Sequence, residues 1–189
     1  MRTAVFGGTF DPVHIGHLVM ADEVLARLDY ERVLFVPTYV PPHKQQSPLA
    51  SSAQRIAMLE LATANRPEFG VLAYEIEQEA VSYTVSTLRH LNESDELTGK
   101  PGLMIGEDLV DGFEDWRDVE TIVQLADIIL LRRPGNGGSQ LNRPHCEVDN
   151  LSLEISASEI RERANARMPF RYLVLPTVFD YIEERGLYR

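Results

Sequence analysis

The stretch of residues 7–17, Gly-Gly-Thr-Phe-Asp-Pro-Val-His-Ile-Gly-His, constrains the fold of this chain more than any other. It follows the apolar residues 3–6 and precedes a segment with apolar residues at helical spacing, which predicts a strand, a tight turn and a helix. Adjacent glycines let the backbone turn sharply and approach a ligand closely. Asp11 is predicted to be the N-cap of the helix and Pro12 its first residue.

The start of this helix is a predicted phosphate site, because unpaired N–H groups and the helix dipole favour an anion there. His14 and His17 are three residues apart and therefore share one face of the first turn. Two imidazoles beside a phosphate indicate phosphoryl or nucleotidyl chemistry; the alternatives are half of a metal site or an ordinary surface pair. The glycine spacing matches neither the Rossmann fingerprint nor the P-loop.

Composition limits the classes of protein to consider. With 189 residues, 44% of them hydrophobic, the chain is expected to form a single domain over residues 1–189. A net charge of −11 argues against a nucleic-acid surface. We expect a cytoplasmic protein with no membrane partner, since no apolar run reaches spanning length and no signal peptide is evident. The single cysteine, Cys146, excludes an internal disulfide and a Cys-rich zinc site.

Short apolar segments alternate with amphipathic ones along the chain, which predicts an α/β fold with a Rossmann-like, doubly wound parallel sheet. The predicted strands are residues 2–6, 32–37, 69–76, 103–105, 127–131 and 151–155. The predicted helices begin at 12 or 13, 51 or 52, 82 and 118, and end near 28, 65, 91 and 125. A small helical C-terminal part follows within residues 151–189, and residues 135–150 are predicted to be a surface loop.

Ligands of open parallel sheets bind where the strands end, so polar residues that follow the predicted strands are candidate contacts. These are His43 and Lys44, Gly106 and Asp108, and Arg132 and Arg133. The alternatives are solvated loops and, for Asp108, a helix cap. Thr84, in the first turn of a helix, is either part of ordinary capping or a ligand contact. Trp116 is either a packing anchor or a surface on which a flat ring stacks.

A second predicted phosphate site lies near the C-terminus. Ser156 or Ser158 caps a new helix there, and Glu159 completes the spacing of a capping box. Ser158 and Arg161 share a helical face, so hydroxyl, N–H and guanidinium groups converge. The alternative is an ordinary capped helix. Pro176 and Gly186 mark the start and end of a last helix.

Several of these segments together resemble one family. Residues 8–17 resemble the first signature of the nucleotidylyltransferase superfamily, and residues 155–161 resemble its Ile-Ser-x-Thr-x-x-Arg signature, with Ser158 in place of threonine. Shorter segments match in order between them, at residues 41–44, 82–84, 105–108, 116–117 and 132–134. The chain is similar to the bacterial nicotinate-nucleotide adenylyltransferases over nearly its whole length, residues 135–150 excepted.

The resemblance implies a reaction in NAD biosynthesis. The phosphate of nicotinate mononucleotide would attack the α-phosphorus of ATP, giving nicotinate adenine dinucleotide (deamido-NAD) and pyrophosphate. No protein nucleophile is required, so catalysis would consist of positioning and charge stabilisation. Mg²⁺ would arrive with ATP, because phosphate oxygens suit a hard cation, and no protein metal site is expected. The resemblance leaves a homo-oligomer open.

The resemblance also implies roles for individual residues. His17, His14 and Arg161 would be the catalytic groups, with His17 at the α-phosphate. The ATP and phosphate contacts would be Gly8, Thr9, Phe10, His43, Lys44, Gly106, Asp108, Arg133, Ser156 and Ser158. Trp116 would stack on the pyridine ring, and Thr84 with the N–H groups of Val85 and Arg117 would bind its carboxylate.

Three alternatives stay open at this point. The same chemistry could act on another acceptor, above all nicotinamide mononucleotide; Trp116 and the Ser82-Tyr83-Thr84 segment disfavour phosphopantetheine or an alcohol phosphate with CTP. A nucleotide-binding sensor could have kept the fold without the reaction. A metal-dependent hydrolase would need carboxylates beside His14 and His17.

Overall fold

The fold is a six-stranded parallel sheet with helices on both faces, seen in a computed structural model that describes residues 1–40, 48–94, 97–132, 140–149, 151 and 153–189. The strand order is β3-β2-β1-β4-β5-β6. The bounds are β1 Thr3–Gly8, β2 Arg32–Pro37, β3 Phe69–Val71, β4 Gly102–Gly106, β5 Asp127–Arg132 and β6 His145–Asp149. This order confirms the predicted doubly wound α/β fold.

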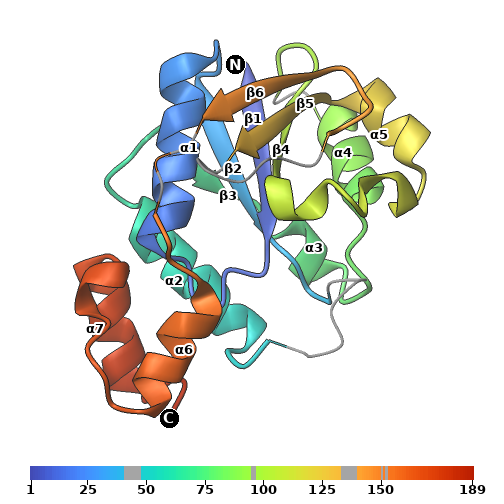
Figure 1. Ribbon diagram of the computed structural model, residues 1–189. Helices are drawn as coiled ribbons and strands as arrows, with labels where there is room; N and C mark the ends of the chain where they lie inside the picture. The colour runs from blue at the N-terminus through green and yellow to red at the C-terminus, as the bar shows by residue number, and fades with distance from the viewer. Residues whose placement is uncertain (41–47, 95–96, 133–139, 150, 152) are drawn as a thin grey trace.

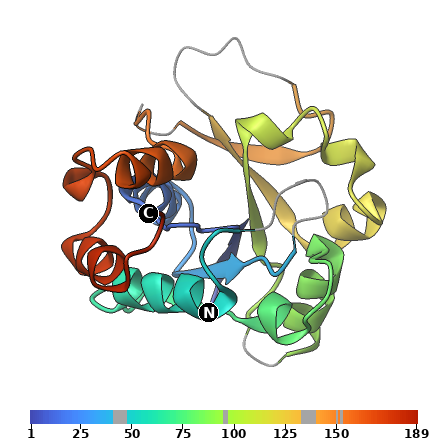
Figure 2. The ribbon, with the colours of Figure 1, turned by 90° about the horizontal axis from the view of Figure 1, so that it is seen from below.

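Helices cover the two faces of the sheet in separate groups (Figure 1). The α-helices are α1 Ile15–Arg27, α2 Ser52–Thr63, α3 Tyr74–Glu77, α4 Thr84–Glu93, α5 Val119–Leu125, α6 Ala157–Asn165 and α7 Pro176–Arg185. Short 3₁₀ turns are η1 Glu107–Leu109, η2 Phe113–Asp115 and η3 Arg171–Leu173. In the view from below, α6 and α7 lie with α1 and α2 on one side of the sheet, and α4 and α5 lie on the other (Figure 2).

Successive side chains of a strand point to opposite faces of the sheet, so the core is divided into two layers. Phe6, Phe35 and Ile129 pack toward α1, α2, α6 and α7, whereas Ile105 and Leu130 pack toward α4 and α5. Successive strand residues are buried on opposite faces, as expected for a parallel sheet covered on both sides. The C-terminal helices share the first layer, so they are part of the main core.

The first helix begins later than predicted. The expected cap at Asp11 and first helical residue at Pro12 are wrong, because α1 begins at Ile15 with His14 as its N-cap residue. The carboxylate of Asp11 accepts instead from the N–H groups of Leu49 and Ala50. Distant backbone therefore satisfies this side chain, and it has no role at the helix start.

Two strand predictions also need correction. The strand expected over residues 69–76 ends at Val71, and α3 takes up its second half. The strand expected over residues 151–155 is absent from the described part of that segment, and β6 lies earlier, at His145–Asp149, within the predicted loop. Only Val148 of β6 is deeply buried, so this edge strand carries little apolar signal.

None of the helices that the structure describes is both long and apolar enough to cross a membrane.

Candidate active site

The two predicted phosphate segments lie at the carboxyl edge of the sheet, together with the described end of β4 at Gly106; this is the end toward the viewer in Figure 2. In register, Gly8 at the end of β1 pairs with Pro37 of β2, and Gly106 at the end of β4 pairs with Leu131 of β5. The central strands therefore end at one level. This is the edge at which open parallel sheets bind ligands.

The turn after β1 is built around the ring of Phe10. An added Cβ on Gly8 would lie 2.9 Å from Phe10 Cζ, so only glycine lets the ring fold back onto the turn. Phe10 has a positive φ of 48°, which is unusual for a bulky residue. Its side chain is 2% exposed and packs edge-on against Phe6 and Phe35. Burial of the ring compensates for the strained backbone and fixes the loop conformation.

His14 and His17 stack face to face, as their spacing predicts. Their ring centroids are 3.7 Å apart with 24° between the planes, and the backbone N–H of His14 donates to His17 Nδ1 over 3.2 Å. His14 is buried, at 5% exposure, and His17 is half-buried. An added Cβ on Gly16 would lie 3.0 Å from the His14 ring, so this glycine makes room for the stack.

Asp11 anchors the signature loop to two distant parts of the chain. Besides the N–H groups of Leu49 (2.8 Å) and Ala50 (3.1 Å), its carboxylate accepts from the hydroxyl of Tyr188 over 2.8 Å. Burial raises the pKa of Tyr188 well above its ordinary value, as does the neighbouring carboxylate. The hydroxyl is therefore a permanent donor. These partners lie far from Asp11 along the chain, so no local sequence pattern predicts them.

Arg55 of α2 is a further support that sequence reasoning missed. Its side chain is 1% exposed, and Nη1 donates to the carbonyl oxygen of Thr9 over 2.8 Å. Burial lowers the pKa of this guanidinium, and Asp11 and Tyr188 partly offset that effect. The signal was available in the sequence: Arg55, Leu59 and Ala62 recur at helical spacing, which puts the arginine on the buried face of α2.

Arg161 joins the second signature to the first. Its Nη1 donates to the carbonyl oxygen of Asp11 over 2.7 Å, across 150 residues of chain, and its Nη2 donates to Ser158 Oγ over 3.1 Å. Ser156 is the N-cap of α6, and its Oγ accepts from the N–H of Glu159 over 3.1 Å. An added Cβ on Gly16 would lie 3.9 Å from Ile155 Cβ, so the start of α6 lies beside the start of α1.

The start of α4 lies at the same edge of the sheet. Thr84 is its first residue. Two residues earlier, the Ser82 hydroxyl accepts from the N–H of Tyr39 over 2.8 Å, and the Ser82 N–H donates to the carbonyl oxygen of Val40 over 3.0 Å. Tyr39 follows β2, so these bonds fix the exposed N–H groups of the helix beside the end of that strand. Val85 is buried in the core.

Glu75 lies buried behind this helix start and was not among the predicted residues. Its Oε1 accepts from Thr87 Oγ1 over 2.6 Å. Burial raises the pKa of this carboxyl, although the hydrogen bond from Thr87 acts in the opposite direction. Glu75 thus connects α3 to α4.

Trp116 and Arg117 lie on the segment between η2 and α5. Trp116 is half-buried and packs against Phe113, with ring centroids 5.1 Å apart and 52° between the planes. The guanidinium carbon of Arg117 lies 4.5 Å from the ring centroid of Tyr83, the N-cap residue of α4. This contact places the Arg117 side chain against Tyr83, the residue that precedes Thr84.

Asp108 is exposed beside Gly106, where an added Cβ would lie 2.6 Å from its Oδ1. It lies inside η1, so the alternative that it caps the following helix is not supported. Arg132, one of the candidate ligand contacts, ion-pairs with Glu107 (3.1 Å) and with Glu147 (2.7 Å). His43, Lys44 and Arg133 lie outside the described residues. No group of three or more His, Cys, Asp or Glu within the described ranges is placed to hold a metal.

The chain is similar in sequence to known proteins over most of its length. A family model described as cytidylyltransferase-like matches residues 5–163. A probable nicotinate-nucleotide adenylyltransferase of Geobacillus thermodenitrificans is 40% identical over 190 residues, which cover 99% of this chain and 86% of the relative. The chain belongs to the nicotinate-nucleotide adenylyltransferase family. A relative of the same name in Treponema pallidum is 37% identical over 203 residues and covers both chains completely.

Solved structures extend the likeness to the fold. Structures of Plasmodium falciparum nicotinic acid mononucleotide adenylyltransferase, complexed with APC and with NaAD, are similar to this chain with TM-scores of 0.77 and 0.78. Identity is 18% in both cases, and the matches cover 99% of this chain and 96% and 97% of those chains. At this identity the likeness concerns the architecture alone.

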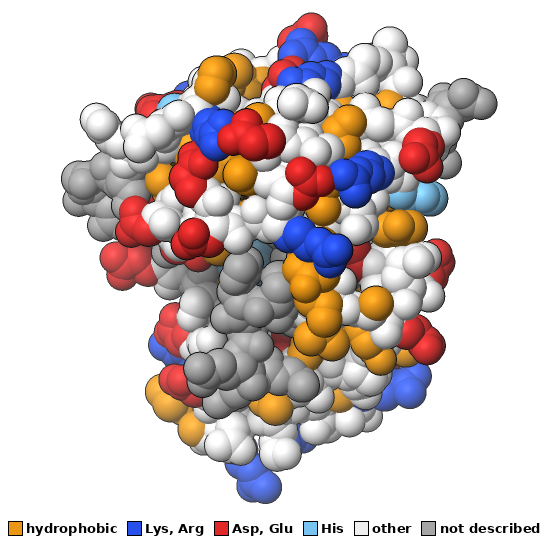
Figure 3. Space-filling view, turned by 90° about the vertical axis from the view of Figure 1, so that its right-hand side faces the viewer, with side chains coloured by type: hydrophobic (Ala, Val, Ile, Leu, Met, Phe, Trp, Pro, Cys, Tyr) orange, Lys and Arg blue, Asp and Glu red, His pale blue; other side chains and the backbone are white. Residues whose placement is uncertain are grey.

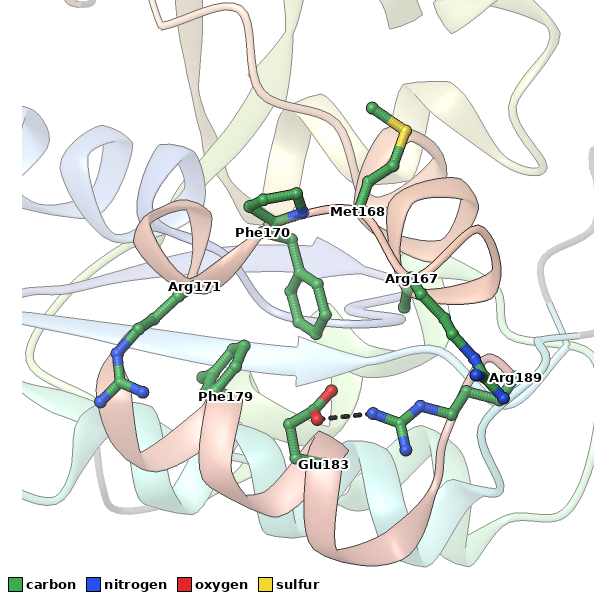
Figure 4. A pocket seen from close by; sticks show the side chains of 9 residues that line it. Arg167, Met168, Phe170, Arg171, Phe179, Glu183 and Arg189 are labelled. Atoms are coloured by element: carbon green, nitrogen blue, oxygen red, sulfur yellow. Dashed lines mark hydrogen bonds and ion pairs between the residues drawn. The ribbon is translucent and has the colours of Figure 1, made fainter.

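One cavity of about 510 Å³ lies apart from these residues, among the last helices. Phe170 and Phe179 line its centre, and Arg167, Arg171 and Arg189 lie at its margin (Figure 4). All of its lining residues fall within 164–189, and none belongs to either family signature. The predicted site residues are therefore distinct from the lining of this cavity.

Proposed function

We propose that this chain transfers the adenylyl group of ATP to nicotinate mononucleotide, releasing pyrophosphate and forming deamido-NAD. The observation that carries the proposal is the hydrogen bond from Arg161 to the carbonyl oxygen of Asp11, over 2.7 Å. It holds the starts of α1 and α6 against one loop, so two sets of phosphate-binding groups face one triphosphate.

ATP lies with its phosphates over the turn after β1. Backbone N–H groups of Gly8, Thr9 and Phe10 bind the phosphates, and His17, the half-buried member of the imidazole stack, faces the α-phosphate. An oxygen of the mononucleotide phosphate attacks the α-phosphorus, and the bond to the β-phosphate oxygen breaks. Charge develops on the oxygens around the α-phosphorus, where a positioned N–H donor is most effective.

Pyrophosphate leaves toward α6. Ser156, Ser158 and Arg161 are placed to stabilise it, because a helix start and a guanidinium together favour a polyanion. Arg161 already binds the loop carbonyl, so its position does not depend on the nucleotide. His14 contacts the triphosphate and supports the ring of His17 from behind. Gly106 and Asp108 bind the adenosine, and His43, Lys44 and Arg133 remain predicted phosphate contacts.

The acceptor binds at the start of α4. Trp116 stacks on the pyridine ring, and the Thr84 hydroxyl with the N–H groups of Val85 and Arg117 binds the carboxylate. Donors placed in this way favour a carboxylate over a neutral amide, because hydrogen bonds to a charged acceptor are stronger than those to a neutral one.

Mg²⁺ is proposed to enter bound to ATP. Phosphate oxygens supply hard ligands and the cation neutralises part of their charge. Asp11 is the carboxylate within the first signature. Its oxygens already accept hydrogen bonds from Leu49, Ala50 and Tyr188, so Asp11 is better suited to supporting the loop than to binding a metal.

The test is a pyrophosphate-release assay with ATP and either nicotinate or nicotinamide mononucleotide. The kcat/KM for nicotinate mononucleotide should be at least about tenfold higher than that for nicotinamide mononucleotide, which is the effect expected from one charge-assisted hydrogen bond. A preference for the amide would contradict the proposed acceptor, and no pyrophosphate with either would contradict the reaction.

A further inference from the structure

The segment that carries Trp116 and Arg117 has no regular structure of its own. Trp116 follows η2 in extended conformation, and Asp118 then takes a left-handed φ of 57° before α5 begins. No ladder of backbone hydrogen bonds fixes such a segment, so its position depends on side-chain contacts. Two sets of side-chain contacts hold the segment, and they come from different parts of the chain.

One set lies on α4 and α5. Arg89 Nη2 bonds to Asp118 Oδ2 over 2.6 Å, and Thr121 Oγ1 donates to Asp118 Oδ1 over 2.8 Å. The buried ring of Phe113 holds the other end of the segment in the core. These contacts fix the ends of the segment but do not link the residues on either side of Trp116 to each other.

Arg143 makes that link. Its Nη2 donates to Glu114 Oε2 over 2.7 Å and to Glu120 Oε1 over 2.6 Å. Nε reaches Glu114 Oε1 over 3.0 Å, and Nη1 reaches Glu120 Oε2 over 3.1 Å. One guanidinium thus binds both carboxylates with two nitrogens each, and it closes a bridge over the residues between them, Trp116 and Arg117 included.

The backbone of Arg143 is held next to the first residue of β6. The carbonyl oxygen of Arg143 lies 2.7 Å from His145 Nδ1, and His145 is the first residue of β6. β6 pairs with β5 over five successive positions, from Ile128–His145 to Arg132–Asp149. The segment with Trp116 is therefore tied to the edge of the sheet. Figure 3, which faces the side of α4 and α5, shows basic and acidic side chains lying directly beside one another there.

We propose that Arg143 is a positioning residue for the acceptor mononucleotide: by bridging Glu114 and Glu120 it fixes the orientation of Trp116 and Arg117. This rests on the proposed function for the identity of the acceptor. All three guanidinium nitrogens already donate to carboxylates, so Arg143 acts through them and does not itself touch substrate. Lysine could not replace it, because a single ammonium lacks the planar fork that spans two carboxylates.

The experiment compares Arg143→Ala and Arg143→Lys with a matched control, Arg66→Ala. Arg66 also binds two carboxylates, those of Asp22 and Glu68, but on the side of α1 and β3. In both Arg143 variants the KM for nicotinate mononucleotide should rise about three- to tenfold, the size expected for two exposed ion pairs acting together. The KM for ATP should change less than about twofold, as should both constants in the control.

A second readout is independent of turnover. Trp116 is the only tryptophan in the chain, so acrylamide quenching of its fluorescence reports on this segment alone. Quenching should increase in both Arg143 variants and not in Arg66→Ala. Unchanged quenching with an unchanged KM for the mononucleotide would overturn the proposal, and so would equal rises in both KM values. If the wild type released no pyrophosphate, the proposed function would fail, while quenching would still decide whether Arg143 fixes Trp116.

Discussion

His17 lies at the start of α1 with three aromatic neighbours. Its ring stacks on His14 and meets the edges of Phe10 and Phe6, with centroids 5.0 and 5.9 Å away. Phe10 and Phe6 are buried, so the imidazole rests on a rigid base. A donor held this way needs no reorganisation when charge develops on a phosphate oxygen, which is the condition for electrostatic catalysis.

His17→Ala should therefore lower kcat by about 10²- to 10³-fold, the usual cost of one positioned donor, with a much smaller change in the KM for ATP. The measurement is steady-state pyrophosphate release with both substrates varied. His90→Ala is the matched control, because His90 lies on α4 and stacks on Tyr74, away from the signatures. Turnover near the wild-type value in His17→Ala would show that His17 is not a catalytic residue.

Residue identities were predictable here, but their contacts were less so. The spacing of His14 and His17 fixes their shared face, and the stack confirms it. Asp11 looked like a helix cap because local sequence offers only local partners. Its actual partners lie 38, 39 and 177 residues along the chain, and tertiary structure alone brings them together.

At the scale of elements, α3 and α4 are joined by a buried carboxyl group. Glu75 on α3 accepts from Thr87 on α4, and burial raises the pKa of Glu75. In the unfolded chain the group titrates near its ordinary value of about 4.3. Above that pH the unfolded state releases a proton that the folded state retains. The free energy of unfolding therefore falls as pH rises toward the pKa of the folded state.

Glu75→Gln should abolish this fall in the free energy of unfolding, since the amide is neutral at every pH and still accepts from Thr87. The melting temperature of the variant minus that of the wild type should increase between about pH 5 and pH 8. Thermal unfolding across that range measures it. Glu77→Gln on the exposed side of α3 is the control and should show no such trend. If the difference in melting temperature between Glu75→Gln and the wild type did not depend on pH, the raised pKa of Glu75 would be contradicted.

Elements differ in how much the sequence reveals about them. The five strands predicted around residues 2–6 to 127–131 all exist, although β3 is shorter, because continuous apolar runs mark buried parallel strands. β6 escaped prediction because an edge strand needs little apolar surface; in His145–Asp149 only Val148 is deeply buried. The polar run before it suggested a loop, whereas backbone pairing with β5 decides the structure.

At the scale of the whole molecule, the site depends on contacts between the first signature and residues near the C-terminus. Arg161 near the C-terminus holds the carbonyl oxygen of Asp11, and Tyr188, the penultimate residue, holds its carboxylate. α7 packs into the core layer shared with β1, through Val178 and Ile182. The C-terminal helices thus complete a site that the first strand begins. The α/β class of the fold and the two signatures were predictable, but these contacts between the two ends of the sequence were not, because no local pattern encodes them.

The most direct test of the account is a crystal structure with a non-hydrolysable ATP analogue. One triphosphate should lie within hydrogen-bond distance, about 2.7–3.2 Å, of His17 and the turn after β1, and also of Ser158 or Arg161. A triphosphate bound to one signature alone, with the other more than about 6 Å away, would contradict the claim that two distant segments form a single site.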